Sequence, residues 1–402
     1  MFKIDAAWDR PAKISNQTSE HILRLRLSSE NHLSASGIPL RLAIALDTST
    51  SMHGEKLEQA KTACQMILSQ QRTEDQLSLA SFATTVTPLK PNQTTINQLN
   101  ASGITRTDLA LDWLHTTLPP EKNTVRVAIL ITDGHATNLQ GHPLEDLDSL
   151  LEQSSRFNAD GILLYTVGLG DAANFNTGFL NELSEQARGS FLYADTPATL
   201  ESQLRDRLTA CQAIAIEEAK LIFNPSSGVT VQSCCCLRPE YVPLEESSPG
   251  EVPLNGLRRN CPTDILVALT VPPAGWEDAH GSQTVLDVRL TNASLPPLTH
   301  LATLNYTQSY REAQQINEAV NRDRLTWEIN RYSSELTRTN NPNRTGELLT
   351  KIQVAALKSG CDDIAQQAHQ QQQELEKTGT LTPHHTATLH QATRNLLEDT
   401  LW

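Results

Sequence analysis

Two groups of oxygen-bearing side chains stand where the sequence predicts that strands end. Asp47, Ser49 and Ser51 lie in DTSTS, and Asp133 lies in TDG. Between them, GITRTDLAL (103–111) is a loop that runs into a predicted helix. Hydroxyl and carboxylate oxygens are the ligands that hard divalent cations prefer, and Mg²⁺ takes six of them at about 2.0–2.1 Å. If folding brings these groups together, they form a site for such a cation.

The chemistry of this site follows from the types of its ligands. Ser49 and Ser51 are two residues apart on a loop, so their neutral hydroxyls can converge. Carboxylates can hold and orient metal-bound water from a second shell. A metal that few formal charges contact directly stays electrophilic, so we expect it to recruit a carboxylate from another molecule. Mg²⁺ and Mn²⁺ both suit hard oxygen ligands, and Ca²⁺ is a further alternative.

Short apolar runs place the two aspartates at the ends of buried strands. LAIAL (42–46) stops at Asp47, and VRVAILI (125–131) stops before Asp133. Strands that alternate with amphipathic helices predict a doubly wound α/β domain on a parallel sheet. Ligands of such sheets bind beyond the carboxyl ends of the strands. The predicted strands are 42–46, 77–82, 125–131 and 162–167, and the predicted helices are 54–71, 107–118, 144–157, 180–187 and 197–211.

The segments on either side of this domain have a different character. Residues 22–27 (ILRLRL) alternate between apolar and charged, which is typical of a half-buried strand. Alternating runs separated by Pro, Gly and Ser clusters predict an antiparallel β-sandwich after residue 213. Near the C-terminus, apolar residues again recur at helical spacing, which predicts four helices in 308–401. The predicted parts are 1–38, N-terminal strands that join the β-sandwich; 39–212, the α/β domain; 213–305, the β-sandwich; and 306–402, a helical C-terminal region.

The composition and net charge argue against several classes of function. The protein has 402 residues, with 32 Lys and Arg against 46 Asp and Glu, and a formal net charge of −14. This acidity argues against binding to nucleic acid or to anionic membrane surfaces, both of which need basic surface. The N-terminal MFKIDAAWDRPAKIS has no apolar core of a signal peptide, and seven scattered cysteines form no disulfide framework. We expect a cytoplasmic protein that binds neither nucleic acid nor membranes.

Two other clusters of reactive side chains are expected to be structural. Adjacent cysteines on a strand point to opposite faces, so the run 234–236 cannot converge on one metal without a bulge. We expect these to be buried or edge cysteines. His384, His385 and His390 lie around the start of a polar helix, and we expect them at the surface.

Enzymatic and nucleotide-binding interpretations of the α/β domain are weaker. Asp47 could be a phosphotransfer nucleophile, but Ser49 stands where a second Asp is expected, and no Lys is obviously placed nearby. Residues 168–173 (GLGDAA) follow the last core strand, whereas a dinucleotide-binding glycine loop opens the first βαβ unit. The sequence contains no P-loop motif and no G-x-S-x-G motif.

At the metal-ligand candidates the sequence resembles the von Willebrand factor A family and its metal-ion-dependent adhesion site. The family pattern is D-x-S-x-S, a Thr on the second loop and an Asp at the end of the fourth strand. This pattern is matched by Asp47, Ser49, Ser51, Thr105 and Asp133. The resemblance covers about 40–210. It implies that the two serines and the threonine coordinate the metal, that the aspartates act directly or through water, and that a partner's Asp or Glu completes the shell.

Beyond the motif, the layout of the whole sequence resembles that of bacterial cytoplasmic proteins that carry an A domain within one polypeptide. Such proteins often occur beside AAA+ ATPases of the MoxR type or in multi-gene stress and defence clusters. His53 and Ser102 depart from the residues that are common in the family, and neither change removes a ligand. His53, Arg106, Asp108 and His135 lie on the loops around the metal, and we expect them to form a rim that selects the partner.

We therefore interpret the protein as a non-enzymatic, Mg²⁺-dependent protein-interaction module or adaptor that binds an acidic side chain of a partner protein. Two alternatives stay open. The protein could be an accessory subunit of an AAA+ ATPase complex. It could also be a self-assembling protein whose metal takes an acidic residue of a neighbouring copy. Candidates for that residue are Asp362, Asp363, Glu398 and Asp399.

Overall fold

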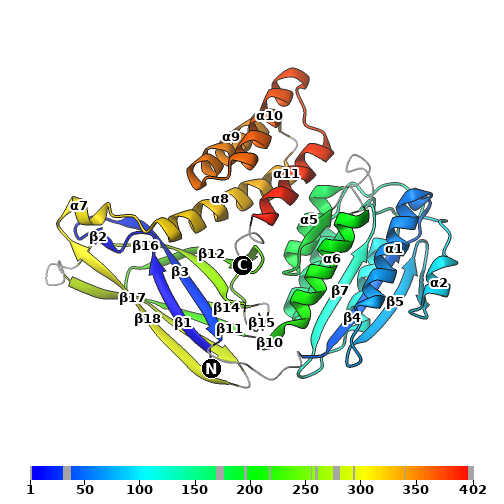
Figure 1. The fold of residues 1–402 in the computed structure, drawn as a ribbon, viewed down its shortest axis with the longest axis horizontal. Helices are drawn as coiled ribbons and strands as arrows, with labels where there is room; N and C mark the ends of the chain where they lie inside the picture. The colour runs from blue at the N-terminus through cyan, green and yellow to red at the C-terminus, as the bar shows by residue number, and fades with distance from the viewer. Residues whose placement is uncertain are drawn as a thin grey trace.

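The computed structural model describes residues 2–29, 38–168, 176–193, 197–216, 219–254, 256–258, 261–274, 281–292, 295–339 and 341–396. Figure 1 shows three parts: a pair of β-sheets on the left, an α/β domain on the right and a group of helices above the junction between them. No helix within the described ranges is long and apolar enough to cross a membrane.

A six-stranded sheet with helices on both faces forms the α/β domain. The strand order is β6-β5-β4-β7-β8-β9, and all neighbours are parallel except β5 and β6. Alternate residues of β4 serve the two faces: Ile44 and Leu46 pack in one apolar cluster, and Ala43 and Ala45 in the other. This is the doubly wound α/β arrangement that the sequence predicts. Its elements are β4 (Leu40–Asp47), η1 (Thr50–Met52), α1 (Glu55–Ser69), β5 (Gln76–Phe82), β6 (Val86–Leu89), α2 (Gln93–Asn97), α3 (Thr107–Thr117), β7 (Val125–Ile131), α4 (Asp148–Ala159), β8 (Ile162–Gly168), α5 (Thr177–Gln186), β9 (Phe191–Tyr193) and α6 (Pro197–Gln212).

The start of α4 differs from the prediction. Apolar spacing predicts a helix from residue 144, but the helix begins at Asp148. The residues before it belong to a loop, because the amide of Leu144 donates to the carbonyl of Ala136 (2.9 Å) and Pro143 bridges to Thr137. The short elements β6 and α2 were not predicted either, since neither is long enough to show a clear apolar period. The glycine-containing segment 168–173 lies outside the described residues from position 169 on.

Two five-stranded sheets share one apolar core and form the β-domain. Their strand orders are β1-β3-β16-β12-β13 and β14-β11-β17-β18-β2. Leu23 and Leu25 of the first sheet pack in the same cluster as Leu221, Phe223 and Val288 of the second. The strands are β1 (Phe2–Trp8), β2 (Ala12–Ile14), β3 (Ser19–Ser29), β11 (Lys220–Pro225), β12 (Thr230–Arg238), β13 (Val242–Leu244), β14 (Glu251–Pro253), β16 (Thr263–Val271), β17 (Gly281–Asn292) and β18 (Leu295–Thr307).

The α/β domain is inserted between two strands of the β-domain. Strand β3 pairs with β16, and β2 pairs with β18, so strands from both ends of the insertion share the same two sheets. A small pair, β10 (Ile214–Ile216) with β15 (Leu257–Arg258), follows α6 at the boundary. There, the amide of Ile38 donates to the carbonyl of Ile214 (3.4 Å), so the two connecting segments touch.

The helical region follows β18 and has its own apolar cluster, in which Leu325 and Ile329 pack against Leu348, Ile352 and Leu389. Its elements are α7 (Tyr310–Ala313), α8 (Glu318–Arg338), α9 (Pro342–Ser359), α10 (Asp362–Thr378) and α11 (Pro383–Asn395). Helix α8 extends from the β-domain towards α5 (Figure 1). The expectation that His390 lies at the surface is wrong, since this side chain is 1% exposed between α8 and α5.

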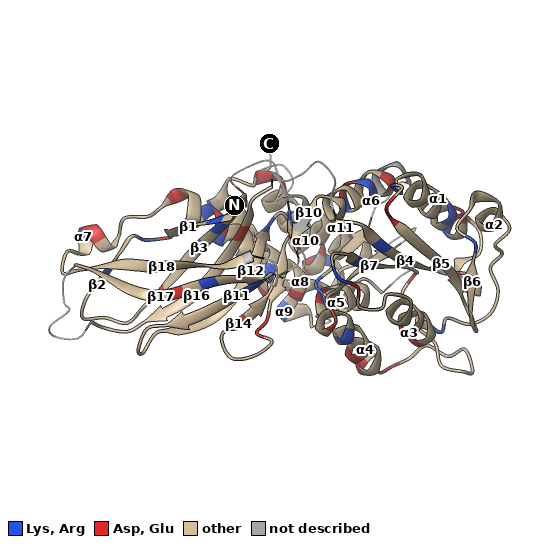
Figure 2. Cartoon of the chain, turned by 90° about the horizontal axis from the view of Figure 1, so that it is seen from below, with Lys and Arg blue, Asp and Glu red and all other residues tan. Residues whose placement is uncertain are grey.

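A cluster of polar groups around Glu185 and Arg394 joins all three parts. Glu185 at the end of α5 accepts hydrogen bonds from Ser334 and Arg338 of α8 and from Arg394 of α11. Arg394 also donates to the carbonyl of Tyr241, next to β13, and its guanidinium stacks on that ring at 4.5 Å. Figure 2 shows acidic and basic residues side by side where the three parts meet. The position of the helical region is therefore fixed by polar as well as apolar contacts.

Candidate metal site

The loops that follow β4 and β7 meet the loop before α3 at one end of the parallel sheet. Strands β4 and β7 are adjacent, so Asp47, the last residue of β4, lies beside the residues that follow β7. Main-chain hydrogen bonds tie the loops together: Thr50 donates to the carbonyl of Gly103 (3.0 Å), and Thr137 donates to that of Thr105 (2.9 Å). The fold thus brings the three predicted groups to one place.

Two fully buried carboxylates form the floor of this site. Asp47 Oδ1 accepts from the amide of Ser49 (2.7 Å), and its Oδ2 accepts from the hydroxyl of Thr132 (2.6 Å). Burial raises the pKa of Asp47 to about 6, hydrogen bonds from Ser49 and Thr132 oppose the rise, and the charge of Asp133 adds to it. The amide of His135 donates to Asp133 Oδ1 (3.3 Å). The floor is therefore acidic and shielded from solvent.

Hydroxyl groups stand above the two carboxylates. The Oγ atoms of Ser49 and Ser51 are 3.0 Å apart; Ser49 is buried and Ser51 is exposed. Neighbouring ligands of an octahedral Mg²⁺ at about 2.1 Å are themselves about 3.0 Å apart. Thr105 is buried, and no residue in the described ranges hydrogen-bonds to its hydroxyl. The chemistry of this donor set, three hydroxyls and two carboxylates on adjoining loops, fits a hard divalent cation.

The family assignment agrees with this geometry. Residues 42–207 match the family profile of the von Willebrand factor type A domain. This part of the protein is a vWA domain. The match spans the whole α/β sheet except the first residues of β4, and it includes every predicted metal ligand.

Sequence relatives match part of the chain. An uncharacterized protein of Synechocystis is 24% identical over 248 residues, which cover 58% of this chain and 57% of that protein. The inter-alpha-trypsin inhibitor heavy chain H3 of rat is 27% identical over 191 residues, which cover 41% of this chain and 20% of that protein. The matched region thus spans about half or less of the length of these relatives.

Two solved structures share the fold along nearly the full length of the protein. One, a von Willebrand factor type A protein from Catenulispora acidiphila, has a TM-score of 0.73 at 13% identity, over 98% of this chain and 96% of that one. The ArnB paralog VWA2 from Sulfolobus acidocaldarius has a TM-score of 0.62 at 15% identity, over 98% of each chain. At these identities the similarity shows a shared fold that extends beyond the vWA domain.

A lysine that sequence reasoning missed enters the site of the vWA domain. Nζ of Lys56 lies 3.1 Å from Asp133 Oδ2, and the lysine side chain is 20% exposed. The expectation that no Lys is placed near the two aspartates is therefore wrong. The position of Lys56 in the sequence could have indicated this contact, because Lys56 is in the first turn of α1, shortly after the DTSTS loop. A cation thus already occupies one side of Asp133.

The four predicted rim residues lie around the site, but they differ in exposure and in whether their charge is paired. Arg106 binds Asp108 through two hydrogen bonds of 2.8 and 2.6 Å, and this guanidinium lowers the pKa of the Asp108 carboxyl. These two charges therefore largely neutralise each other. His53 and His135 are exposed. The histidines are the rim residues that a ligand can contact most directly.

No other metal cluster competes with this site among the described residues: they contain no group of three or more His, Cys, Asp or Glu side chains that could hold an ion. The cysteines of β12 alternate as expected, because Cys234 packs in the core between the sheets and Cys235 packs against Trp327 on the opposite face. Burial raises the pKa of Cys234 and of Cys236 to about 12. These thiols are therefore protonated and unreactive at neutral pH.

Proposed function

We propose that this protein is a non-enzymatic protein-interaction module whose vWA domain binds a divalent cation, with Mg²⁺ the first choice. Through the cation it binds the carboxylate of a partner protein. In this proposal Ser49, Ser51 and Thr105 supply hydroxyl ligands, and Asp47 and Asp133 hold the cation directly or through water. The partner's Asp or Glu takes a remaining position. The protein acts as an adaptor inside the cell.

One observation carries the proposal: the hydroxyls of Ser49 and Ser51 lie 3.0 Å apart, and Ser49 bonds to Asp47, one of two fully buried carboxylates that interact. Neighbouring buried carboxylates destabilise one another unless a cation compensates them. Lys56 compensates one of them through its contact with Asp133. The nearest partners of Asp47 are neutral donors, Ser49 and Thr132, so a bound cation would supply the missing charge.

The same arrangement makes partner binding switchable. With a cation in place, an incoming carboxylate meets positive charge and can become a ligand. Without it, the carboxylate approaches an acidic floor and is repelled. Partner affinity should therefore follow the occupancy of the metal site.

Self-assembly remains a second candidate function, because exposed carboxylates are available on the helical region. Asp362 and Asp363 are exposed in the first turn of α10, where a neighbouring copy could present them to the metal. The other sequence candidates, Glu398 and Asp399, lie outside the described residues. Light-scattering mass with Mg²⁺ and with EDTA distinguishes the two functions, since only self-assembly makes the mass itself fall in EDTA.

Isothermal titration with Mg²⁺ and Mn²⁺ tests the proposal directly. We expect binding by the wild type and a loss of at least about tenfold in affinity for Ser49→Ala and for Asp133→Ala, because each removes an oxygen ligand. Ser155→Ala is a matched control, because that hydroxyl bonds only to its own helix. Unchanged affinity in both site variants, with unchanged melting temperatures, would refute the metal site.

Partner capture forms the second half of the test. The immobilised protein is exposed to cell extract in Mg²⁺ and in EDTA, and proteins retained only in Mg²⁺ are tested again with the Asp133→Ala variant. The proposal expects that this variant loses them. Capture that persists with the variant would show that partner binding does not use the cation.

A further inference from the structure

We propose that the groove between α8 and α9 is a docking site for an acidic amphipathic helix of a partner protein. This site is independent of the metal, since it lies on the helical region. The groove has a volume of about 240 Å³, and its walls include Tyr332 of α8 and Lys351, Val354 and Lys358 of α9.

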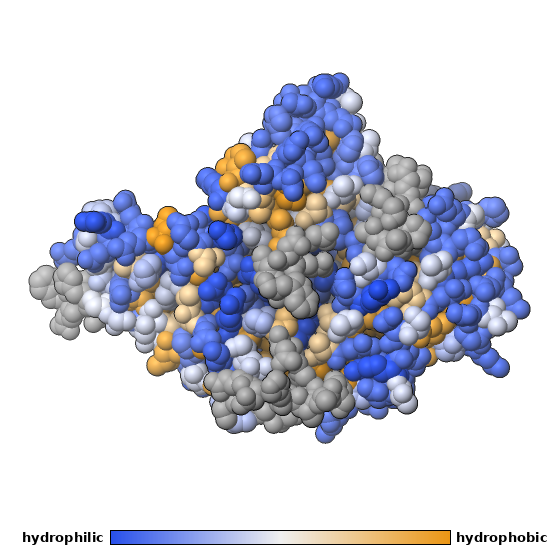
Figure 3. All heavy atoms as spheres, in the orientation of Figure 1, coloured by the Kyte–Doolittle hydropathy of each residue, from blue (hydrophilic) through white to orange (hydrophobic). Residues whose placement is uncertain are grey.

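Apolar side chains stand exposed in the groove, at Val354, and beside it on the same helix, at Leu357. Val354 is 44% exposed and Leu357 is 56% exposed, although α9 buries its opposite face against α8 and α10 through residues such as Leu348 and Ile352. Figure 3 shows hydrophobic surface on the helical region where α9 lies, within surroundings that are mostly hydrophilic. The two residues are three positions apart and so lie on one face of the helix. Burying this strip against an apolar partner surface would remove it from water, which is favourable.

Unpaired cations flank the apolar strip. Within the described ranges, no carboxylate forms an ion pair with Lys351 or Lys358, which line the groove, or with Arg331, which lines the cavity on the other side of α8. Arg331 and Lys351 instead approach the ring of Tyr332, at 5.2 and 5.5 Å from its centre. Two carboxylates of these helices are themselves paired: Glu347 with Arg344 at 2.9 Å, and Glu328, which lines the groove, with Arg324. In a protein with a net charge of −14, this surface is locally basic.

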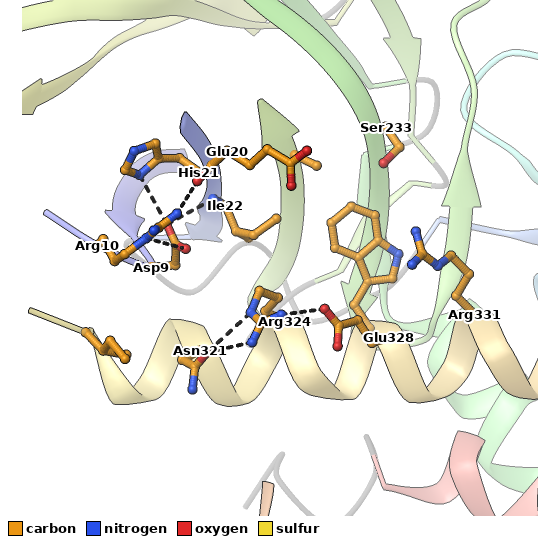
Figure 4. Close-up of a pocket in the computed structure, with 13 residues that line it drawn as sticks. Asp9, Arg10, Glu20, His21, Ile22, Ser233, Asn321, Arg324, Glu328 and Arg331 are labelled. Atoms are coloured by element: carbon orange, nitrogen blue, oxygen red, sulfur yellow. Dashed lines mark hydrogen bonds and ion pairs between the residues drawn. The ribbon is translucent and has the colours of Figure 1, made fainter. Parts of the chain in front are cut away.

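A larger cavity on the other side of α8 lacks this imbalance. It measures about 440 Å³ and lies between α8 and the outer face of the first sheet (Figure 4). Three arginines and three acidic residues line it, so its charge is balanced. Figure 4 shows two of its ion pairs: Arg10 lies near Asp9 (3.4 Å), and Arg324 bonds to Glu328. Paired charges leave little for a charged ligand to gain. Arg324 and Glu328 also line the α8–α9 groove as a pair, but Lys351 and Lys358 there form no ion pair among the described residues. This groove is therefore the better docking site for an acidic ligand.

Charge and spacing define the partner. Lys351 and Lys358 are seven residues apart, two helical turns, and Val354 and Leu357 lie between them. A helix packed along the groove would place apolar residues on this strip and would reach the two lysines with carboxylates also about two turns apart. The predicted partner sequence therefore has Asp or Glu at positions i and i+7, with large apolar residues at i+3 and i+4.

A peptide-display experiment tests this prediction. The full-length protein is immobilised at low salt in EDTA, which keeps divalent cations out of the metal site. It is then screened against random peptides of about twelve residues, roughly three helical turns. We expect enrichment of peptides in which two acidic residues flank apolar ones at the stated spacing. A selected peptide is then synthesised with a fluorophore, and its affinity is measured by anisotropy. Leu357→Ser and the pair Lys351→Glu, Lys358→Glu should each weaken it by at least about tenfold.

Controls separate the outcomes. Leu301→Ser removes an equally exposed leucine (56%) from β18 and should leave affinity unchanged. The charge-reversed variant should select basic peptides in place of acidic ones. The proposal fails if no acidic–apolar pattern is enriched or if the variants bind as the wild type does. It also fails if the groove binds phosphatidylserine vesicles in preference to the peptide, which would make it a membrane surface. Because EDTA is present throughout, failure here leaves the metal proposal untouched, and the converse also holds.

Discussion

Asp133 stands between two possible cations, the ammonium of Lys56 and a bound metal ion. In the structure the ammonium lies 3.1 Å from the carboxylate. A divalent cation at the same carboxylate meets repulsion from that charge. We predict that Lys56→Met raises Mg²⁺ affinity by roughly three- to tenfold, measured by titration calorimetry. Lys61→Met, on the same helix but paired with Glu58, should change nothing. Weaker binding by Lys56→Met would mean that the lysine positions Asp133 for the metal.

The pKa of Asp47 predicts opposite pH effects with and without metal. Because this pKa is raised to about 6, the folded state binds a proton there before the unfolded state does. The contribution of Asp47 to the stability of the metal-free protein therefore grows as the pH falls through 6. Metal binding needs the ionised carboxylate, so Mg²⁺ affinity falls over the same range. We expect the rise in melting temperature caused by Mg²⁺ to be large at pH 7 and small at pH 5.

Asp47→Asn provides the control for this effect, because its side chain cannot ionise. The variant should show little stabilisation by Mg²⁺ at either pH. A wild-type response to Mg²⁺ that is constant from pH 7 to 5 would place Asp47 outside the set of residues that hold the cation.

The positions of the metal-site residues could be predicted because each follows a strand end that the apolar pattern marks. LAIAL and VRVAILI locate Asp47 and Asp133 at the carboxyl ends of neighbouring strands. The contact of Lys56 was missed because it depends on how the first turn of α1 leaves the loop, which no spacing rule gives. The pairing of Arg106 with Asp108 was missed for a similar reason, since sequence alone does not say whether two nearby charges meet.

Helix α5 links the candidate metal site to the helical region. At its start, the amide of Asn176 donates to the carbonyl of Asp133 (3.2 Å). Further along, Asn181 Oδ1 accepts from His390 Nε2 of α11 (2.9 Å), and Glu185 binds Arg394. One rigid element therefore contacts the metal loop at one end and the last described helix at the other.

His390 makes the docking of α11 sensitive to acid. Burial, together with the nearby charges of Arg394 and Arg338, lowers the pKa of His390, so the ring is neutral while its Nδ1 accepts from Ser333. A lowered histidine pKa means that the unfolded state binds the proton more readily. This contribution to stability is complete above about pH 6.5 and is lost as the pH falls below it. We predict faster hydrogen exchange in residues 383–395 at pH 5 than at pH 7, after correction for intrinsic rates.

His390→Gln is the matched variant, because glutamine can donate to Asn181 and accept from Ser333 but does not titrate. Its exchange rates in 383–395 should show the smaller dependence on pH. Equal acid sensitivity in the variant and the wild type would assign the effect to another group.

Among the helices and strands, the sequence predicts those with a periodic apolar pattern and misses the irregular ones. Strands and helices with several apolar repeats, such as β7 and α3, were predicted close to their observed bounds. The start of α4 was misplaced because Pro143 and Leu144 bond back to the metal-face loop, a tertiary contact. The burial of His390 was missed because its partners, Ser333 and Asn181, are far away in sequence.

In the whole molecule, Arg394 is the residue that reaches all three parts. Its side chain contacts Glu185 of the vWA domain, Ser334 of α8 and Tyr241 of the β-domain, and the residue is 6% exposed. Removing one partner of a buried ion pair costs about 3–5 kcal/mol, because the other charge is left poorly compensated. We predict that Arg394→Met lowers the free energy of unfolding by about 3 kcal/mol, measured in urea, since Arg338 still binds Glu185.

The exposed pair of Arg205 with Glu201 offers a comparison within the same protein. Arg205→Met should change stability by less than about 1 kcal/mol, because surface ion pairs contribute little. X-ray scattering should show a larger radius of gyration for Arg394→Met and an unchanged one for Arg205→Met. An equal, small effect of both substitutions would mean that apolar packing alone holds the three parts together.

The insertion of the vWA domain between β3 and β11 has a mechanical consequence. The described residues at which the domain begins and ends, Ile38 and Ile214, bond to each other at the end of the sheet opposite Asp47. Tension applied to a partner held at the carboxyl ends of the strands is transmitted along the sheet and enters the β-domain through two adjacent segments. If a partner binds there as proposed, each segment would bear part of the load, and the attachment would fail only when both segments give way.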